Sequence, residues 1–209
     1  LSTHPDGQST ISGGQFDGLT LSDYLAQNPQ ALGTHCQAFE NFPVLIKFID
    51  AKQPLSIQVH PSDEYALEVE HQYGKTEMWY VMDAEPGAFL YFGVNQELAP
   101  EEFRRRIEDN TVEQVLHKAP VHPGDVFFIP SGTLHAIGAG LVIAEIQQNS
   151  NVTYRVFDYG RLGADGKPRP LHVEKALAVT DRRPAPALDF GEHLGDCRYF
   201  TTDGHQGDF

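Results

Sequence analysis

Short runs of apolar residues, each bounded by glycine, proline or polar residues, recur along the chain. Residues 43–50 (PVLIKFID) form a continuous apolar run with β-branched residues, whereas residues 54–61 (PLSIQVHP) alternate apolar and polar side chains. Further runs of these kinds lie at 76–84, 88–93, 111–121, 125–132, 141–148 and 152–160. Such runs are typical of β-strands, so the chain predicts about eight short strands joined by turns.

Helical patterns occur between these runs. Residues 62–74 begin with Ser62 or Asp63 as a helix cap, continue with an acidic first turn and close at Gly74. Other short helices are predicted at 19–29, 100–110 and 171–179. Residues 1–35 otherwise predict loops around short strands, and 181–192 predict a proline-rich surface connection.

The order of these elements indicates the fold class. The helices are isolated insertions and do not alternate regularly with strands, which argues against a doubly wound α/β sheet. Short strands broken by glycine and proline turns favour a β-sandwich or barrel. We therefore expect a mainly β protein with short helical insertions.

Composition and charge limit the classes of molecule that the protein can bind. The 209 residues contain 40% hydrophobic residues and suit one globular domain, or one domain and part of another. A net charge of −14 disfavours nucleic acid and anionic lipid, and no apolar stretch is long enough to span a membrane. We expect a small-molecule substrate and a monomer or weak homo-oligomer. Cys36 and Cys197 form no metal-binding motif, which indicates thiols in a reducing compartment and a cytoplasmic location.

Four residues stand out as candidate metal ligands. Gln58 and His60 lie two positions apart on an alternating strand, so their side chains share one face. Glu77 lies in the next predicted strand, where a lone buried carboxylate is costly without a metal or a cation. His135 follows far downstream. Two imidazoles, a carboxylate and an amide oxygen suit Zn²⁺, although each residue taken alone has a simple structural explanation.

The segment from Gly124 to His135 (GDVFFIPSGTLH) resembles the second motif of the cupin family. Its spacing is glycine, five residues, proline, one residue, glycine, two residues and histidine. Ala139 stands where the motif normally has an asparagine, so the match is incomplete. This resemblance implies that His135 projects into a barrel.

Four longer blocks narrow the family: LSIQVHPSDEYA, YGKTEMWYVMDA, PSGTLHAIGAG and EIQQNSNVTYRVFDYGR. Together they resemble type I phosphomannose isomerase, a zinc-dependent branch of the cupin superfamily. The resemblance implies a cupin-type jelly-roll barrel with one Zn²⁺ per chain, bound by Gln58, His60, Glu77 and His135. It also implies interconversion of mannose 6-phosphate and fructose 6-phosphate through an enediol(ate).

The same resemblance places catalytic roles on Arg155, Lys75 and Glu145. Arg155 matches the family's catalytic arginine, Lys75 its lysine beside the metal-binding glutamate, and Glu145 an acidic residue that lines the pocket. From the residues alone, Arg155 also suits a salt bridge with Asp158, and Lys75 a solvated turn. The proton-transfer group stays open between Glu145, Lys75 and a metal-bound water.

The resemblance also implies a division into domains. Residues 1–195 correspond to the cupin-like catalytic domain with a truncated N-terminus, and residues 196–209 to the start of a second, truncated β domain.

The candidate metal ligands also suit two other functions. The chain could be a metal-containing cupin that binds sugar without converting it, or an iron cupin dioxygenase. Retention of Arg155 and Lys75 argues against a pure binding module, and Gln58 as an extra ligand argues against the dioxygenase.

Overall fold

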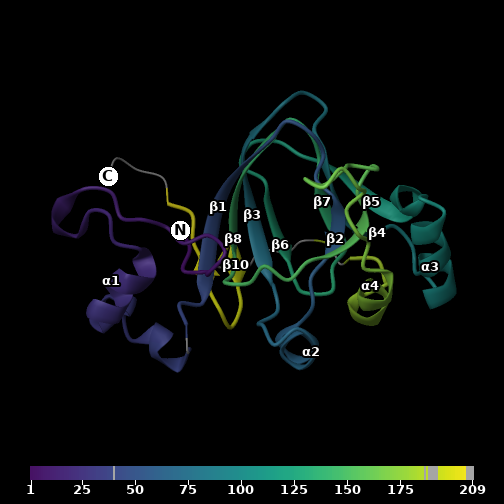
Figure 1. Cartoon of the computed structure of the whole chain (residues 1–209). Helices are drawn as coiled ribbons and strands as arrows, with labels where there is room; N and C mark the ends of the chain where they lie inside the picture. Colours follow the sequence, from purple (N-terminus) through teal and green to yellow (C-terminus); the bar gives the residue numbers. More distant parts are fainter. Residues whose placement is uncertain (40, 186, 188–192, 206–209) are drawn as a thin grey trace.

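Two antiparallel sheets face each other in the computed structural model, which describes residues 1–39, 41–185, 187 and 193–205 (Figure 1). The four-stranded sheet has the order β1 (Val44–Ala51), β8 (Leu141–Gln148), β3 (Glu77–Ala84) and β6 (Val126–Ile129). The five-stranded sheet has the order β5 (Leu116–Pro120), β4 (Phe89–Val94), β7 (His135–Ile137), β2 (Ile57–Val59) and β9 (Tyr154–Phe157). The predicted mainly β, cupin-type sandwich is confirmed.

The helices are short and lie outside the two sheets (Figure 1). They are α1 (Leu21–Gln27), α2 (Asp63–Val69), α3 (Pro100–Glu108) and α4 (Val173–Val179). Four 3₁₀ turns accompany them: η1 (Gly14–Phe16), η2 (Pro29–Leu32), η3 (His35–Ala38) and η4 (Val112–Val115). Phe103 and Ile107 of α3 and Ala176 of α4 belong to the same buried apolar cluster as Ile57 and Val59, so helices cover the outer face of the five-stranded sheet. None of the helices in the described ranges is long and apolar enough to cross a membrane.

The space between the sheets changes character along the strands. Trp79, Val81 and Ile143 pack with Leu90 and Ile137 of the opposite sheet in one apolar core. Toward the start of β3 and the end of β8, the buried side chains are instead polar or charged, as with Glu77, Glu145 and Gln147. Because side chains alternate along a strand, these residues share the inner face with Trp79, Val81 and Ile143. The interior is therefore apolar at one end and polar at the other.

A C-terminal hairpin covers part of the outer face of the four-stranded sheet. It consists of β10 (Gly195–Asp196) and β11 (Thr201–Thr202). Phe200 packs with Met78 and Val126, with Phe128 and Ile146 alongside. The chain thus doubles back onto the four-stranded sheet after residue 193.

Several predicted boundaries are wrong. The helix predicted at 62–74 ends at Val69, because the chain must turn back to begin β3 and Gly74 packs against the start of the same helix. Residues 111–121 begin as the 3₁₀ turn η4, whose Val112 and Val115 are both buried, and only then continue as β5. The three-residue strand β7 was not among the predicted strands.

The N-terminal prediction is also wrong in part. Within residues 1–35 the structure forms 3₁₀ turns, α1 and one isolated bridge between Thr10 and Thr20, but no strand. Thr20 caps α1, where its side chain accepts a hydrogen bond from the N–H of Asp23. The proline-rich connection at 181–192 lies partly outside the described residues, since 186 and 188–192 are not described.

Candidate metal centre

Inward-facing side chains form rows across neighbouring strands of each sheet. Gln58 of β2 is in register with His135 of β7 on one side and with Arg155 of β9 on the other. Residues directly opposite one another on paired strands point to the same face of the sheet. The register therefore brings together three residues that are 77 and 20 positions apart in sequence (135 − 58 and 155 − 135).

The four-stranded sheet contributes a second polar row. Trp79 of β3 lies opposite Glu145 of β8, and Glu145 lies opposite Lys47 of β1. Glu77, two residues before Trp79, faces inward as well. The rings of Trp79 and His135 meet edge to face with centroids 5.4 Å apart, which joins the rows of the two sheets.

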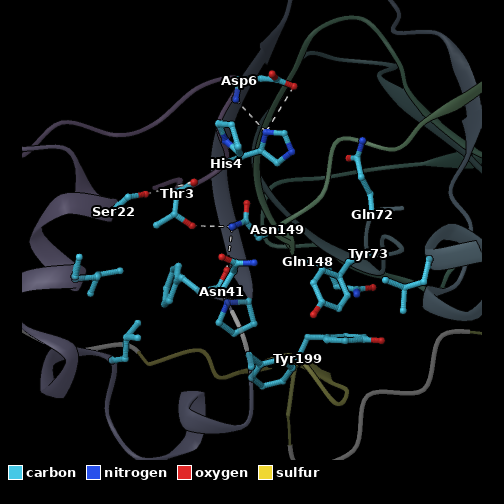
Figure 2. A pocket seen from close by; sticks show the side chains of 18 of the residues that line it. Thr3, His4, Asp6, Ser22, Asn41, Gln72, Tyr73, Gln148, Asn149 and Tyr199 are labelled. Atoms are coloured by element: carbon cyan, nitrogen blue, oxygen red, sulfur yellow. Dashed lines mark hydrogen bonds and ion pairs between the residues drawn. The ribbon is translucent and has the colours of Figure 1, made fainter. Parts of the chain in front are cut away.

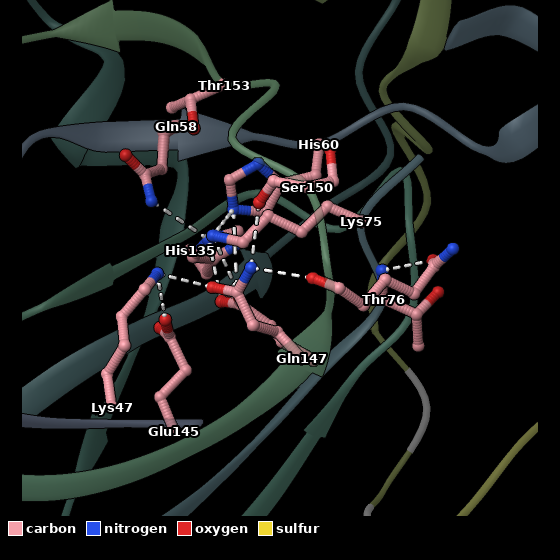
Figure 3. A network of polar contacts seen from close by, with 12 residues as sticks. Lys47, Gln58, His60, Lys75, Thr76, His135, Glu145, Gln147, Ser150 and Thr153 are labelled. Carbon is pink, nitrogen blue, oxygen red and sulfur yellow. Dashed lines mark hydrogen bonds and ion pairs between the residues drawn. The ribbon is translucent and has the colours of Figure 1, made fainter. Parts of the chain in front are cut away.

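Three of the predicted ligands converge in the buried interior. One ligand atom from each of His60, Glu77 and His135 lies within 4.8 Å of the others. His60 Nε2 is 3.6 Å from Glu77 Oε2, and His135 Nε2 is 3.3 Å from Glu77 Oε1. All three side chains are at most 2% exposed. Figure 3 shows the two histidines at the centre of a polar network.

The orientation of both imidazoles fits a cation between them. His60 Nδ1 lies 2.8 Å from the carbonyl of Val152, and His135 Nδ1 lies 2.9 Å from the carbonyl of Thr133. A carbonyl only accepts, so each Nδ1 carries the proton and each Nε2 presents a lone pair to Glu77. Burial, with Lys75 and His135 nearby, holds the pKa of His60 well below its ordinary value, so its ring is neutral.

Both oxygens of Glu77 are buried; Lys75 Nζ lies 2.9 Å from Oε2, whereas Oε1 has no hydrogen-bond donor among the described residues. Lys75 supplies a positive charge beside Oε2 and His60 Nε2, but the lone pair of His135 Nε2 faces Oε1 with no donor between them. A bound cation would stabilise this pair of acceptors. Two nitrogen donors and one carboxylate suit a borderline divalent ion such as Zn²⁺. The side chains present fit the predicted metal.

Lys75 lies inside this cluster. Its Nζ is 2.9 Å from Glu77 Oε2 and 3.2 Å from His60 Nε2. The side chain is 5% exposed, so the interpretation of Lys75 as a solvated turn residue is wrong. Burial alone would lower the pKa of Lys75, but the attraction of Glu77 and Glu145 outweighs it and raises the pKa above its ordinary value. Lys75 is therefore a fixed cation.

Gln58 lies beside the triad, but its amide nitrogen, and not its amide oxygen, faces His135. Its Nε2 is 3.4 Å from His135 Nε2, while its Oε1 accepts a hydrogen bond from Ser56 Oγ at 3.2 Å. Only the amide oxygen can bind a metal. A half-turn of the amide would exchange the two atoms and bring the oxygen toward His135.

Glu145 is held by two donors. Lys47 Nζ donates to Oε1 at 2.8 Å, and Trp79 Nε1 donates to Oε2 at 3.0 Å. Burial tends to raise the pKa of Glu145, yet Lys75 and Lys47 together hold it below its ordinary value. Glu145 is thus a buried carboxylate next to the cluster (Figure 3).

Sequence reasoning missed two members of this network, Lys47 and Gln147. Lys47 also donates to Gln147 Oε1, and Gln147 Nε2 donates to the carbonyls of Gln148 and Ser150. The signal for Lys47 was present, because it is the single charged residue within the apolar run from Val44 to Ile49. Gln147 lies two residues after Glu145 on the same inner face. It is also a polar residue in a largely apolar run, but an uncharged one, so the sequence signal was weaker.

Arg155 lies at the edge of this arrangement. Its Nη1 donates to the carbonyl of Pro170 at 3.5 Å, and within the described residues its side chain makes no hydrogen bond or ion pair with the His-Glu-His triad. Asp158 instead binds Arg161 at 2.6 Å and Arg169 at 2.5 Å. The simple salt bridge between Arg155 and Asp158 therefore does not form.

A separate cavity of about 790 Å³ has no residue of the triad in its lining; Figure 2 shows the residues that do line it. Segments from the N-terminus, α1, the end of α2 and the end of β8 line it, including His4, Ser22, Tyr73, Asn149 and Tyr199. None of the predicted metal ligands or catalytic residues borders this cavity. Its size alone therefore does not mark the chemical centre.

Comparisons with known proteins agree with this geometry. A family model described as the catalytic domain of type I phosphomannose isomerase matches residues 1–88. The mannose-6-phosphate isomerase of Streptococcus mutans is 42% identical over 188 residues, which are 90% of this chain and 58% of that protein. The chain thus spans less than two thirds of this relative.

Solved structures show the same relationship. The crystal structure of the mannose 6-phosphate isomerase from Bacillus subtilis matches with a TM-score of 0.81 and 38% identity, over 91% of this chain and 59% of that one. A zinc-bound crystal structure of a mannose 6-phosphate isomerase has 16% identity and a TM-score of 0.66. That match covers 92% of this chain and 70% of the other, and shows a shared fold.

Proposed function

Since the chain belongs to the type I phosphomannose isomerase family, we propose that it carries the metal-binding core of an isomerase acting on mannose 6-phosphate and fructose 6-phosphate. The observation that carries the proposal is the buried His60–Glu77–His135 cluster, in which Glu77 Oε1 has no hydrogen-bond donor among the described residues. Relatives named as isomerases do not favour the binding-module or dioxygenase alternatives.

One Zn²⁺ per chain would be held by His60, Glu77 and His135, with Gln58 as a fourth ligand after its amide turns. The nitrogen and oxygen donors and their burial support zinc, and relatives with this fold include a zinc-bound isomerase. When bound, zinc would polarise the sugar oxygens next to the carbon atoms that exchange a proton.

We assign the other steps of the reaction to the charged side chains around the ligands. Lys75 stays protonated because its pKa is raised, so we assign it to stabilising negative charge on the substrate rather than to removing a proton. Glu145 stays ionised and is the side chain suited to accept a proton. Arg155, in register with Gln58, offers a planar fork of donors to a phosphate or a developing oxyanion.

A coupled isomerase assay tests the proposal. The given chain and a longer parent chain are assayed with mannose 6-phosphate, beside elemental analysis of each. We expect about one zinc per chain and turnover that His135→Ala abolishes together with the metal. Sugar binding without turnover by the parent chain would indicate a binding module, and iron with oxygen consumption would indicate a dioxygenase.

The remaining features of the chain support coarser proposals. We place the end of the catalytic domain near residue 195, where the β10–β11 hairpin begins to pack on the outer face of the sheet, and propose that 196–209 start a second β unit. Cys36 and Cys197 are both free thiols, which supports a reducing, cytoplasmic location. A monomer or weak homo-oligomer stays a prediction.

A further inference from the structure

The carboxylate of Asp63 binds three distant parts of the chain. Its Oδ1 accepts the backbone N–H of Gly74 at 2.8 Å and the side-chain amide of Gln148 at 2.9 Å. Its Oδ2 accepts the hydroxyl of Tyr199, a residue of the C-terminal segment. Asp63 is also the first residue of α2, three positions after His60. One side chain therefore links the segment that carries His60 to three other segments.

The backbone on both sides of Lys75 is held by the same groups. The N–H of Lys75 donates to the carbonyl of Pro61 at 3.0 Å, and the N–H of Thr76 donates to Gln148 Oε1 at 2.7 Å. With Gly74 bound to Asp63, three consecutive backbone N–H groups are tied to residues 61–63 or to Gln148. We call Asp63, Gly74 and Gln148 the Asp63 clamp.

Gly74 is required for this close approach. A Cβ at position 74 would lie 2.4 Å from the carbonyl carbon of Ser62, 2.5 Å from the nitrogen of Asp63 and 2.6 Å from the carbonyl oxygen of Pro61. All three atoms belong to the backbone, so no side chain can move aside. The strand leading to Glu77 is thus packed directly onto the turn that follows His60.

We propose that Asp63 is a positioning residue for the metal centre. Through the Asp63 clamp it holds the His60 segment against the segment of Lys75 and Glu77. This sets the 3.2 Å separation of Lys75 Nζ from His60 Nε2 and the 3.6 Å separation of His60 Nε2 from Glu77 Oε2. The inference rests on the metal site of the proposed function, but not on the identity of the sugar.

Asp63 is not needed to start its own helix. Ser62 is the cap of α2, and its side chain accepts the N–H of Tyr65. Glu64, the neighbouring acid in the same first turn, supplies negative charge to the helix start, and its carboxylate makes no hydrogen bond or ion pair with any described residue. The bonds of Asp63 instead leave the helix and reach residues 11, 85 and 136 positions away.

Three variants separate positioning from helix stability. Asp63→Ala removes both oxygens of the clamp. Asp63→Asn keeps Oδ1 for Gly74 and Gln148, and its amide can donate to the hydroxyl of Tyr199. Glu64→Ala removes a carboxylate from the same turn without touching the clamp.

The metal alone serves as the probe, so the sugar need not be known. Co²⁺ affinity is measured by competition with a chelator, the visible absorption of bound Co²⁺ reports ligand geometry, and melting temperature reports stability. For Asp63→Ala we expect a loss of about 10- to 100-fold in Co²⁺ affinity, as for other residues that orient metal ligands, and an altered Co²⁺ spectrum. Asp63→Asn should restore the wild-type spectrum, and Glu64→Ala should leave spectrum and affinity unchanged.

Several outcomes would overturn the inference. One is a folded Asp63→Ala protein with wild-type Co²⁺ affinity and spectrum, whatever its melting temperature, because Asp63 would then serve only the fold. If Asp63→Ala does not fold, Gln148→Leu, which removes the partner of Thr76 and Asp63, must alter the spectrum instead. Tight Co²⁺ binding without isomerase activity would defeat the proposed function and leave the clamp standing, whereas a wild-type chain that binds no Co²⁺ would defeat both.

Discussion

Replacing Glu77 with glutamine tests the metal centre most directly. Glu77→Gln keeps the shape of the side chain but removes the single carboxylate of the His-Glu-His triad. An amide nitrogen would then face one of the two imidazole Nε2 atoms, which lie 3.3 and 3.6 Å from the carboxylate oxygens. A hydrogen bond from that amide can satisfy the Nε2 lone pair without a cation. The variant should therefore fold yet bind zinc poorly.

The size of the effect follows from the position of Glu77. Changing groups that only orient metal ligands costs about 10- to 100-fold in metal affinity, so loss of a charged ligand should exceed about 100-fold. A factor of 100 corresponds to about 2.8 kcal/mol of binding free energy. Because zinc stabilises only the form that binds it, saturating zinc should protect the variant less than wild type by that amount. For a chain of this size, 2.8 kcal/mol corresponds to roughly 5–11 °C of melting temperature.

Thermal unfolding with zinc and with a chelator measures this difference. The matched control is Glu113→Gln, because Glu113 accepts a hydrogen bond from Tyr91 at 3.0 Å and does not belong to the triad. The control should keep the wild-type increase in melting temperature on adding zinc. If Glu77→Gln showed the full wild-type increase, and bound stoichiometric zinc by elemental analysis, the assignment of Glu77 as a ligand would be refuted.

Three further substitutions test the residues around the triad. Arg155→Ala should keep zinc and melt within a few degrees of wild type while turnover falls about 100-fold or more, since loss of one preorganised donor costs about 10²–10³; a large melting loss with normal turnover would contradict this. Arg169 and Arg161 hold the pKa of Asp158 below its ordinary value against the effect of burial, so Asp158 stabilises the fold above about pH 3.9 and this contribution is lost as pH falls through its folded pKa. Asp158→Asn should therefore cost about 1.5–3 kcal/mol in unfolding free energy at pH 7 and progressively less below pH 4, as denaturant titrations at several pH values will show. Lys47→Met removes one of two donors to Glu145 and should raise the pKa of that carboxyl, moving the acidic limb of the activity profile to higher pH, and an unchanged profile would exclude Glu145 from proton transfer.

Local patterns in the sequence predicted much of this protein. Alternation placed Gln58 on the face opposite Ile57 and Val59, and the structure buries both apolar residues in the core that α3 and α4 share. The same period places Arg155 and Asp158, three positions apart, on opposite faces, and Asp158 binds Arg161 and Arg169. These features depend on a two-residue period that every strand repeats, so neighbouring residues are enough to infer them.

Other features depended on which segments become neighbours. The helix predicted to close at Gly74 ends at Val69. Gly74 instead packs against the backbone of residues 61–63, which requires the chain to turn back before that position. Lys47 and Glu145 lie 98 positions apart in sequence and meet only because β1 pairs with β8 in a single register. A run of apolar residues predicts that a strand is buried, but it does not predict which strand pairs with it.

The sequence by itself thus determined most of the strands, the faces of their side chains and, through resemblance, the candidate ligands. Only the tertiary structure decided that both imidazoles present Nε2 to Glu77, that Lys75 is buried as a cation and that Asp63 ties their segments together. The physical reason is that alternation and turn chemistry act between residues adjacent in the chain. Charge state and ligand geometry instead depend on burial and hydrogen bonds among segments that only the complete packing of the two sheets brings together.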